Sequence, residues 1–208
     1  MNDLGPPPRS AHTLVFDSIR QRTVCFGGLS NISDPGSAFG DTWEWEGQDW
    51  TQMAETGPAA RSFHAMAYDS DRSRTVLFGG QVAGGFLNDT WEWDGTEWTQ
   101  VADTGPSPRD ACGATYYTSR QRVVLFGGET ISQGMVSQVG ETWEFGSGAW
   151  TQVATRAWAY CGGGACIQWH VDAPVQSEGW LNLDMGRKAL DRTPRHWPRI
   201  TSGRRDNL

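Results

Sequence analysis

Residues 89–100 read DTWEWDGTEWTQ, and nearly the same string stands at 41–52 (DTWEWEGQDWTQ) and at 141–152 (ETWEFGSGAWTQ). In each copy two aromatic residues are separated by one residue, so both lie on one face of a β-strand while the glutamate between them lies on the other. A turn then leads to a second Trp strand. The pair Asp94-Gly95 predicts a two-residue hairpin turn with both residues at positive φ. One supersecondary unit is therefore repeated along the chain.

The repeat extends on both sides of this string, with a period of about 50 residues. An arginine opens each copy, and a Gly-Gly pair follows it at a constant distance; these are Arg9, Arg61 and Arg109, with the pairs at 27–28, 79–80 and 127–128. The middle copy predicts strands at 62–68, 74–78, 91–93 and 98–101. The corresponding first and second strands are expected at 11–16 and 23–26, and at 113–117 and 123–126. Four short strands joined by turns make an antiparallel meander.

Composition agrees with an all-β chain. The 208 residues can bury the core of one ordinary domain, and 12 Trp with 26 Gly suit many short strands that pack by large flat side chains. The net charge of −7 hides two regions. Residues 1–154 hold 9 Arg, no Lys and 19 acids, whereas 155–208 hold 8 basic residues and 5 acids. An acidic repeat region argues against a nucleic-acid partner, since phosphate binding draws on Lys and Arg.

The sequence gives no sign of a membrane or a redox framework. No run is long and apolar enough to span a bilayer, and the first ten residues, MNDLGPPPRS, are not a signal peptide, so neither membrane association nor export is expected from the chain as it stands. The compartment stays undetermined. The four cysteines, at 25, 112, 161 and 166, hold unrelated places in the repeats, so no disulfide pattern is predicted.

Five short motifs recur in a fixed order, and together they resemble the kelch motif. In the middle copy they are Arg-x-x-His (61–64), Phe-Gly-Gly (78–80), Asp-Thr-Trp-x-Trp (89–93), Trp-Thr (98–99) and Thr-Gly-Pro (104–106). The resemblance covers residues 5–154 and implies a β-propeller in which each repeat forms a four-stranded blade whose first strand lines a central channel. We therefore expect a partial kelch-type β-propeller of three four-stranded antiparallel blades, at about 9–60, 61–108 and 109–154, followed by an irregular C-terminal tail at 155–208.

Three blades are too few for a closed ring of this kind. Propellers with such blades usually need about four or more, because each twisted sheet buries both faces against neighbours. The chain is thus interpreted as a piece of a larger propeller that associates or aggregates through its exposed blade faces.

The tail carries no strand pattern, and a frame-shifted origin is one hypothesis for it. Met185-Gly186 is necessarily encoded ATG-G, so the frame displaced by one base reads TGG, Trp; Trp197-Pro198 likewise gives Gly. With suitable synonymous codons, residues 182–191 would read TWTWDGKHWT, a fourth copy of the repeat. The alternative is a genuine, unrelated tail. The nucleotide sequence decides between them, since the hypothesis requires CTG codons at Leu183 and Leu190.

Function is expected on the face that carries the long, variable loops, at 29–40, 81–88 and 129–140, together with the connections between blades. The candidate ligand-binding residues lie beside the channel mouth on that face: Arg9, Arg61, Arg109, His12 and His64. Three arginines could bind carboxylates or an acidic peptide. Because the Arg recurs in every copy, a structural role, holding blades together, is favoured; His12 and His64 share a position that is Cys112 in the third copy, which favours packing.

Two classes of function remain open. One is a binding module for a protein segment or a carbohydrate, with no catalytic residues, no cofactor and no metal, because no Ser/His/Asp set, nucleotide loop or metal cluster can be assembled from the repeats. The other is a fragment of a propeller enzyme acting on sugars, since some kelch-type propellers are copper sugar oxidases or sialic-acid epimerases. The oxidase would need a Cys–Tyr–His set at the mouth, and the paired Tyr116 and Tyr117 lack such partners. The binding module is favoured.

Overall fold

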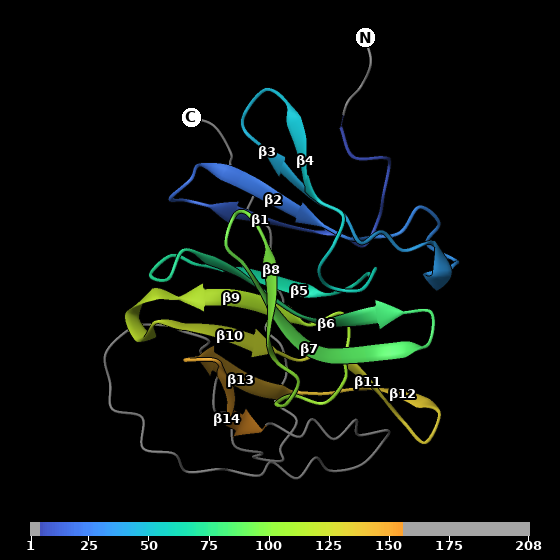
Figure 1. Ribbon diagram of the computed structural model, residues 1–208. Helices are drawn as coiled ribbons and strands as arrows, with labels where there is room; N and C mark the ends of the chain where they lie inside the picture. Colours follow the sequence, from blue (N-terminus) through green and yellow to red (C-terminus); the bar gives the residue numbers. More distant parts are fainter. Residues whose placement is uncertain (1–4, 156–208) are drawn as a thin grey trace, which may run out of the picture. The chain divides into compact units, whose positions relative to one another are not determined.

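The computed structural model describes residues 5–155, all within the first of two compact units, Met1–Trp169. They form three four-stranded antiparallel sheets (Figure 1). Blade one holds β1 (Thr13–Asp17), β2 (Arg22–Phe26), β3 (Thr42–Trp45) and β4 (Trp50–Ala54); blade two holds β5 (Ala65–Asp69), β6 (Arg74–Val82), β7 (Gly85–Trp93) and β8 (Trp98–Ala102); blade three holds β9 (Gly113–Tyr117), β10 (Arg122–Phe126), β13 (Glu141–Gly146) and β14 (Ala149–Thr155). The all-β class with partial kelch-type blades is confirmed. The tail and its frame hypothesis lie outside the described residues, apart from the end of β14.

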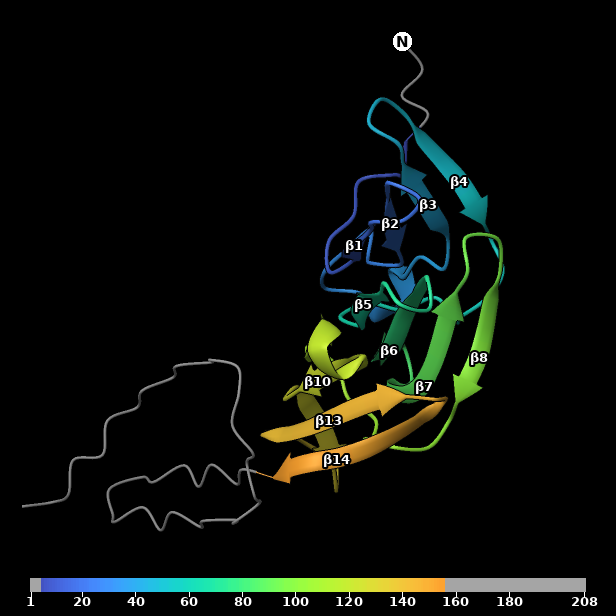
Figure 2. The same ribbon diagram turned by 90° about the vertical axis from the view of Figure 1, so that its left-hand side faces the viewer.

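The blades stack through their faces, with the first strands side by side. β1 contacts β5, and β5 contacts β9, so these are the inner strands (Figures 1 and 2). Between blades one and two the core is built around Phe26, Met66, Leu77 and Trp93. Between blades two and three it holds two adjoining groups, one around Val76 and Phe145 and one around Phe78 and Leu125. The apolar residues of each strand therefore serve the space between blades.

The inner strands begin later than the sequence predicts. β5 starts at Ala65 rather than at 62, and β1 starts at Thr13 rather than at 11. The cause is a kink just before each strand, where Ala11, Phe63 and Ala111 adopt the left-handed conformation with φ of 54°, 53° and 50°. These kinks join the blades, since Phe63 N–H donates to Ala11 O at 2.9 Å and Ala111 N–H donates to Phe63 O at 2.8 Å.

Two of the three predicted loops between second and third strands are β-hairpins. In blade two, β6 and β7 continue past Gly79-Gly80 and pair as far as Val82 with Gly85. In blade three a separate pair, β11 (Glu129–Ser132) and β12 (Met135–Gln138), replaces the loop predicted at 129–140. Only the first copy has a loop without strands there, with a short 3-10 helix at Pro35–Ser37. The length difference between copies is thus absorbed outside the four-stranded ladders.

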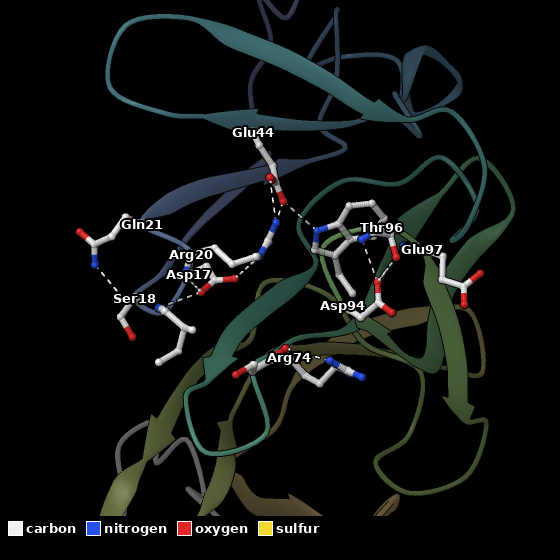
Figure 3. Close-up of polar contacts among 12 residues, drawn as sticks. Asp17, Ser18, Arg20, Gln21, Glu44, Arg74, Asp94, Thr96 and Glu97 are labelled. Carbon is white, nitrogen blue, oxygen red and sulfur yellow. Dashed lines mark hydrogen bonds and ion pairs between the residues drawn. The ribbon is translucent and has the colours of Figure 1, made fainter.

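The turn between third and fourth strands also differs from expectation. Trp93 pairs with Trp98, which leaves a four-residue turn from Asp94 to Glu97. Gly95 has φ of +103°, but Asp94 is not at positive φ; its carboxylate instead accepts the backbone N–H groups of Thr96 at 2.8 Å and Glu97 at 2.9 Å (Figure 3). The predicted two-residue turn with both residues at positive φ occurs only in blade three, at Ser147-Gly148.

Candidate functional site

The loops between second and third strands share one face with the connections between blades, as the strand order requires. The backbone of Arg61 inserts into the loop base of the preceding blade: its N–H donates to Phe39 O at 3.1 Å, and its carbonyl accepts from Gly28 N–H at 2.9 Å. Arg109 repeats this contact with Leu87 and Gly80, at 3.0 and 2.9 Å. The loop bases of blades one and two are therefore each held by the start of the next blade.

The Gly-Gly pairs permit that close approach. Gly79 has φ of +62°, and a Cβ at this position would lie 2.6 Å from Arg109 O. Gly27 is in the same situation, with φ of +64° and a Cβ position 2.5 Å from Arg61 O. Only glycine combines this φ with this distance from a backbone oxygen. The motif is thus required by the junction between blades.

The repeated arginine points back into its own blade. Arg61 donates two hydrogen bonds to the Asp89 carboxylate, at 2.6 and 2.8 Å, and one to Gly79 O at 2.9 Å. The same carboxylate accepts the indole N–H of Trp91 at 2.7 Å. Arg61 is fully buried, so its guanidinium is satisfied by the protein itself. We call this three-residue contact the Arg clamp; Arg9, Asp41 and Trp43 form it in blade one.

Blade three carries a variant of the Arg clamp. Glu141 replaces the aspartate, and its Oε2 accepts one hydrogen bond from Arg109 at 2.6 Å and one from Trp143 at 3.0 Å. Ser107 Oγ takes up the remaining Nη2 donor at 3.0 Å. The longer acidic side chain therefore gives up the two-pronged contact of the other blades.

The carboxylates of the Arg clamps stay ionised. Burial alone would raise the pKa of Asp89, but the hydrogen bonds and positive charge of Arg61 outweigh burial, so this pKa lies below its ordinary value. The pKa values of Asp41 and Glu141 are lowered for the same reason, by Arg9 and Arg109. Each clamp is a charged pair whose two members depend on one another.

The predicted arginines and histidines come together at the start of the inner strands, but not as open ligand-binding groups. Arg109 is fully buried, and Arg9 lies over the ring of Phe39 at 4.1 Å. His64 is 4% exposed and packs edge-on against Phe26, with ring centroids 5.5 Å apart. Burial, aided by Arg61 and His12, lowers the pKa of His64 to about 3, so it is neutral. A direct role in ligand binding stays a prediction for these residues.

Polar atoms without partners gather beside them. Within the described part of the chain, both ring nitrogens of His64, Nδ1 of His12, Oγ of Ser62 and Oδ1 of Asp110 are buried and have no hydrogen-bond partner. Burial and the neighbouring Glu129 raise the pKa of Asp110 to about 6. We call these groups, which stand just before or at the start of the inner strands, the polar cluster; a ligand or water could satisfy them.

Sequence reasoning missed Asp110. It takes the place of Ser10 and Ser62, and its exchange for an acid in one copy was a visible signal. Its perturbation could not be read from the sequence, because Glu129 comes from the following loop and meets Asp110 only through a pair of backbone hydrogen bonds, at 3.1 and 2.9 Å.

The loop-bearing face also exposes apolar side chains. Met135 is 68% exposed and Val136 57% exposed, both on β12, and Ile131 on β11 is 47% exposed. Ile32, in the loop of the first copy, is 58% exposed.

Few side chains in residues 5–155 are placed for metal or redox chemistry. No three His, Cys, Asp or Glu side chains there lie close enough to hold a metal ion. Tyr116 and Tyr117 stand at the far end of β9 from the mouth, and Tyr116 Oη donates to Asp71 at 2.8 Å. Cys25 and Cys112 are free thiols, and burial raises the pKa of each to about 11. In the same range, no helix is long and apolar enough to cross a membrane.

Blades that share an Arg clamp and a Gly-Gly junction define a β-propeller repeat protein of the kelch type. The model of the KLHDC2/KLHL20/DRC7 Kelch-repeats domain matches residues 1–166, and the chain therefore belongs to this kelch-repeat family. No curated protein matches the chain. Kelch domains generally serve in protein–protein interaction.

Proposed function

We propose that the chain is a propeller binding module that holds a protein segment on its loop-bearing face. The observation that carries this proposal is the contrast between a fixed base and variable, exposed loops. Arg clamps repeat in all three blades and Gly-Gly junctions at both boundaries between the described blades, whereas the loops above them are a coil with a 3-10 turn, an extended hairpin and a separate hairpin. Variation confined to loops on a rigid base is how such scaffolds acquire specificity.

A protein segment is favoured over a carbohydrate because the exposed groups are aliphatic. Met135, Val136, Ile131 and Ile32 present flexible or branched apolar surface suited to apolar side chains of a partner. The polar cluster around Asp110 and His64 would then fix the orientation of the bound segment. The buried arginines would act indirectly, by holding the loop bases in place.

Selection of peptides from a random display library on the purified chain tests the proposal, with a glycan array as the parallel arm. Met135→Asp on β12 is expected to weaken the selected peptides about tenfold or more, as loss of a central apolar contact does. Ile19→Asp is the matched control: Ile19 is 63% exposed but lies in the β1–β2 turn, on the opposite face. Peptides that bind both variants equally, or binding by glycans alone, would contradict a peptide site on these loops.

A further inference from the structure

Each blade has two unlike faces, and the two interfaces in the chain join one kind to the other. The donor face carries two aromatic residues, at the end of the third strand and the start of the fourth; the acceptor face carries Phe, Thr and Glu. The donor faces hold Trp45 and Trp50, Trp93 and Trp98, and Phe145 and Trp150; the acceptor faces hold Phe26, Thr42 and Glu44, then Phe78, Thr90 and Glu92, then Phe126, Thr142 and Glu144.

Inside the chain these faces meet in one register. Trp98 Nε1 donates to Thr42 Oγ1 at 2.8 Å, and its ring meets Phe26 edge-on at 5.2 Å. Trp150 repeats both contacts one blade further on, with Thr90 Oγ1 at 2.8 Å and with Phe78 at 5.1 Å. The fit between a donor face and an acceptor face is thus built twice from the same side chains.

The two outermost faces of the described blades keep this design without a blade against them. On the donor face of blade one, Trp45 and Trp50 hold ring centroids 5.6 Å apart, close to the 5.5 Å of Trp93 and Trp98. On the acceptor face of blade three, Phe126 is 52% exposed, whereas its counterparts Phe26 and Phe78 are 0% and 2% exposed. Leu14 and Phe16, beside the donor face, are 51% and 52% exposed.

From this complementarity we infer that two copies of the chain form a reciprocal dimer. The donor face of blade one of each copy lies on the acceptor face of blade three of the other copy, so the dimer has two identical interfaces. The internal interfaces fix the register: Trp50 donates to Thr142 of the second copy and packs on its Phe126, and Trp45 donates to its Glu144. Arg120 already pairs with Glu144 at 2.8 Å, as Arg20 pairs with Glu44, so docking buries a compensated carboxylate.

The kinks at the mouth supply a second match. The hydrogen bonds from Phe63 N–H to Ala11 O and from Ala111 N–H to Phe63 O run from blade to blade in one direction. A second copy extends the series, because its Ala11 N–H meets Ala111 O of the first. The described residues of two copies contribute six blades, within the range of about 4–8 that closes a propeller, whereas those of one copy contribute too few and those of three contribute too many.

Mixing two variants, each with one of its two outer faces altered, tests this assembly. The full chain is expected to sediment as a dimer at micromolar concentration. Trp50→Asp destroys the donor face and Phe126→Asp the acceptor face, so each variant alone is expected to be monomeric. Mixing them leaves one intact donor face and one intact acceptor face, on different chains, and is expected to restore a 1:1 pair. Gly84→Asp is the control that stays dimeric, since it lies in the β6–β7 turn of the middle blade, where a Cβ meets nothing within 4 Å.

A milder pair of variants covers the case in which a buried charge unfolds the chain. Trp50→Phe and Thr142→Val remove the two ends of one predicted hydrogen bond; each is expected to weaken the dimer about tenfold, and the double variant no further. A monomeric wild-type chain, an open ladder of oligomers, no pairing in the mixture, or additive effects of the milder variants would each overturn the proposal. Peptide binding to the loops is measured separately, so its failure is distinguishable.

Discussion

Trp93 donates its indole N–H to Glu44 of the preceding blade at 3.0 Å, and the same carboxylate accepts two hydrogen bonds from Arg20, at 3.0 and 2.8 Å (Figure 3). The contact ties two blades through a charge that is already neutralised within blade one. In blade three Phe145 stands at the position of Trp93 and has no N–H to donate; its ring instead lies 5.8 Å from the Arg72 guanidinium. The two interfaces therefore share the hydrogen bond from Trp to Thr and differ in the polar contact at the position of Trp93 and Phe145.

Trp93→Phe is expected to lower the free energy of unfolding by about 1–3 kcal/mol, because one hydrogen bond to a charged group and some packing are lost while Glu44 keeps Arg20. Urea denaturation followed by tryptophan fluorescence measures the change. Because Phe145 shows that the position accepts Phe, a wholly unfolded variant would contradict this account.

Arg61→Met is expected to destabilise the chain by about 3–5 kcal/mol, because Asp89 is left as a partly buried charge without its partner. Arg61→Met combined with Asp89→Asn should recover part of that loss, since the orphaned charge is gone. Thermal unfolding of the single and double variants measures both. Equal stability of the two would show that the charge is not the cause.

Gly79→Ala is expected to cost about 2–4 kcal/mol, because it combines a positive φ with a Cβ at 2.6 Å from Arg109 O. Gly84→Ala is the matched control: it lies in the β6–β7 turn, where a Cβ meets nothing within 4 Å and φ is not positive. Urea denaturation should leave the control close to wild type. A small effect at Gly79 would mean that the junction between blades can yield.

His64 predicts a loss of stability in mild acid. The unfolded chain takes up a proton on this residue near pH 6.5, whereas the folded chain takes it up only near a pKa of about 3. Stability therefore falls as pH drops below about 6.5, by about 2 kcal/mol at pH 5. Denaturation of wild type and His64→Gln at pH 7 and pH 5 checks this, since the variant should lack this share of the pH dependence.

The raised pKa of Asp110 predicts the opposite dependence of stability on pH. Its pKa is about 6 in the folded chain and about 3.8 when unfolded, so the folded state is favoured while Asp110 is protonated and loses stability as pH rises through about 6. After allowance for solvent near the mouth, the loss is about 1 kcal/mol. Asp110→Asn should be more stable than wild type at pH 7.5 and equal to it below pH 4. If wild type and Asp110→Asn showed the same dependence of stability on pH, the pKa of Asp110 would not be raised in the folded chain.

The sequence predicted the features that each repeat carries within itself. The aromatic pairs around Glu92 and the Phe-Gly-Gly run gave the third strands and the ends of the second strands, because period-two alternation and glycine are local signals. The kelch resemblance gave the blades and their order. The structural role favoured for Arg61, holding blades together, stays a prediction: its guanidinium contacts Asp89 and Gly79 of its own blade, and its backbone contacts Phe39 and Gly28 of the preceding blade.

Features that depend on a neighbouring segment escaped prediction. The sequence predicts loops where the second and third copies form hairpins. In the third copy the turn is Gln133-Gly134, with φ of 52° and 78°, the two-residue type that favours a hairpin. The kink at Phe63 is set by hydrogen bonds to Ala11 and Ala111 in other blades, which no local pattern encodes. The same holds for the perturbed pKa of Asp110, which needs Glu129.

Arg61 belongs to two blades at once, since its backbone completes the loop base of blade one and its guanidinium closes blade two. The boundary of the sequence repeat and the boundary of the folded blade consequently differ by a few residues. Cutting the chain just before Arg61 would take away the backbone that completes the loop base of blade one, whereas cutting it a few residues later would leave that contact in place.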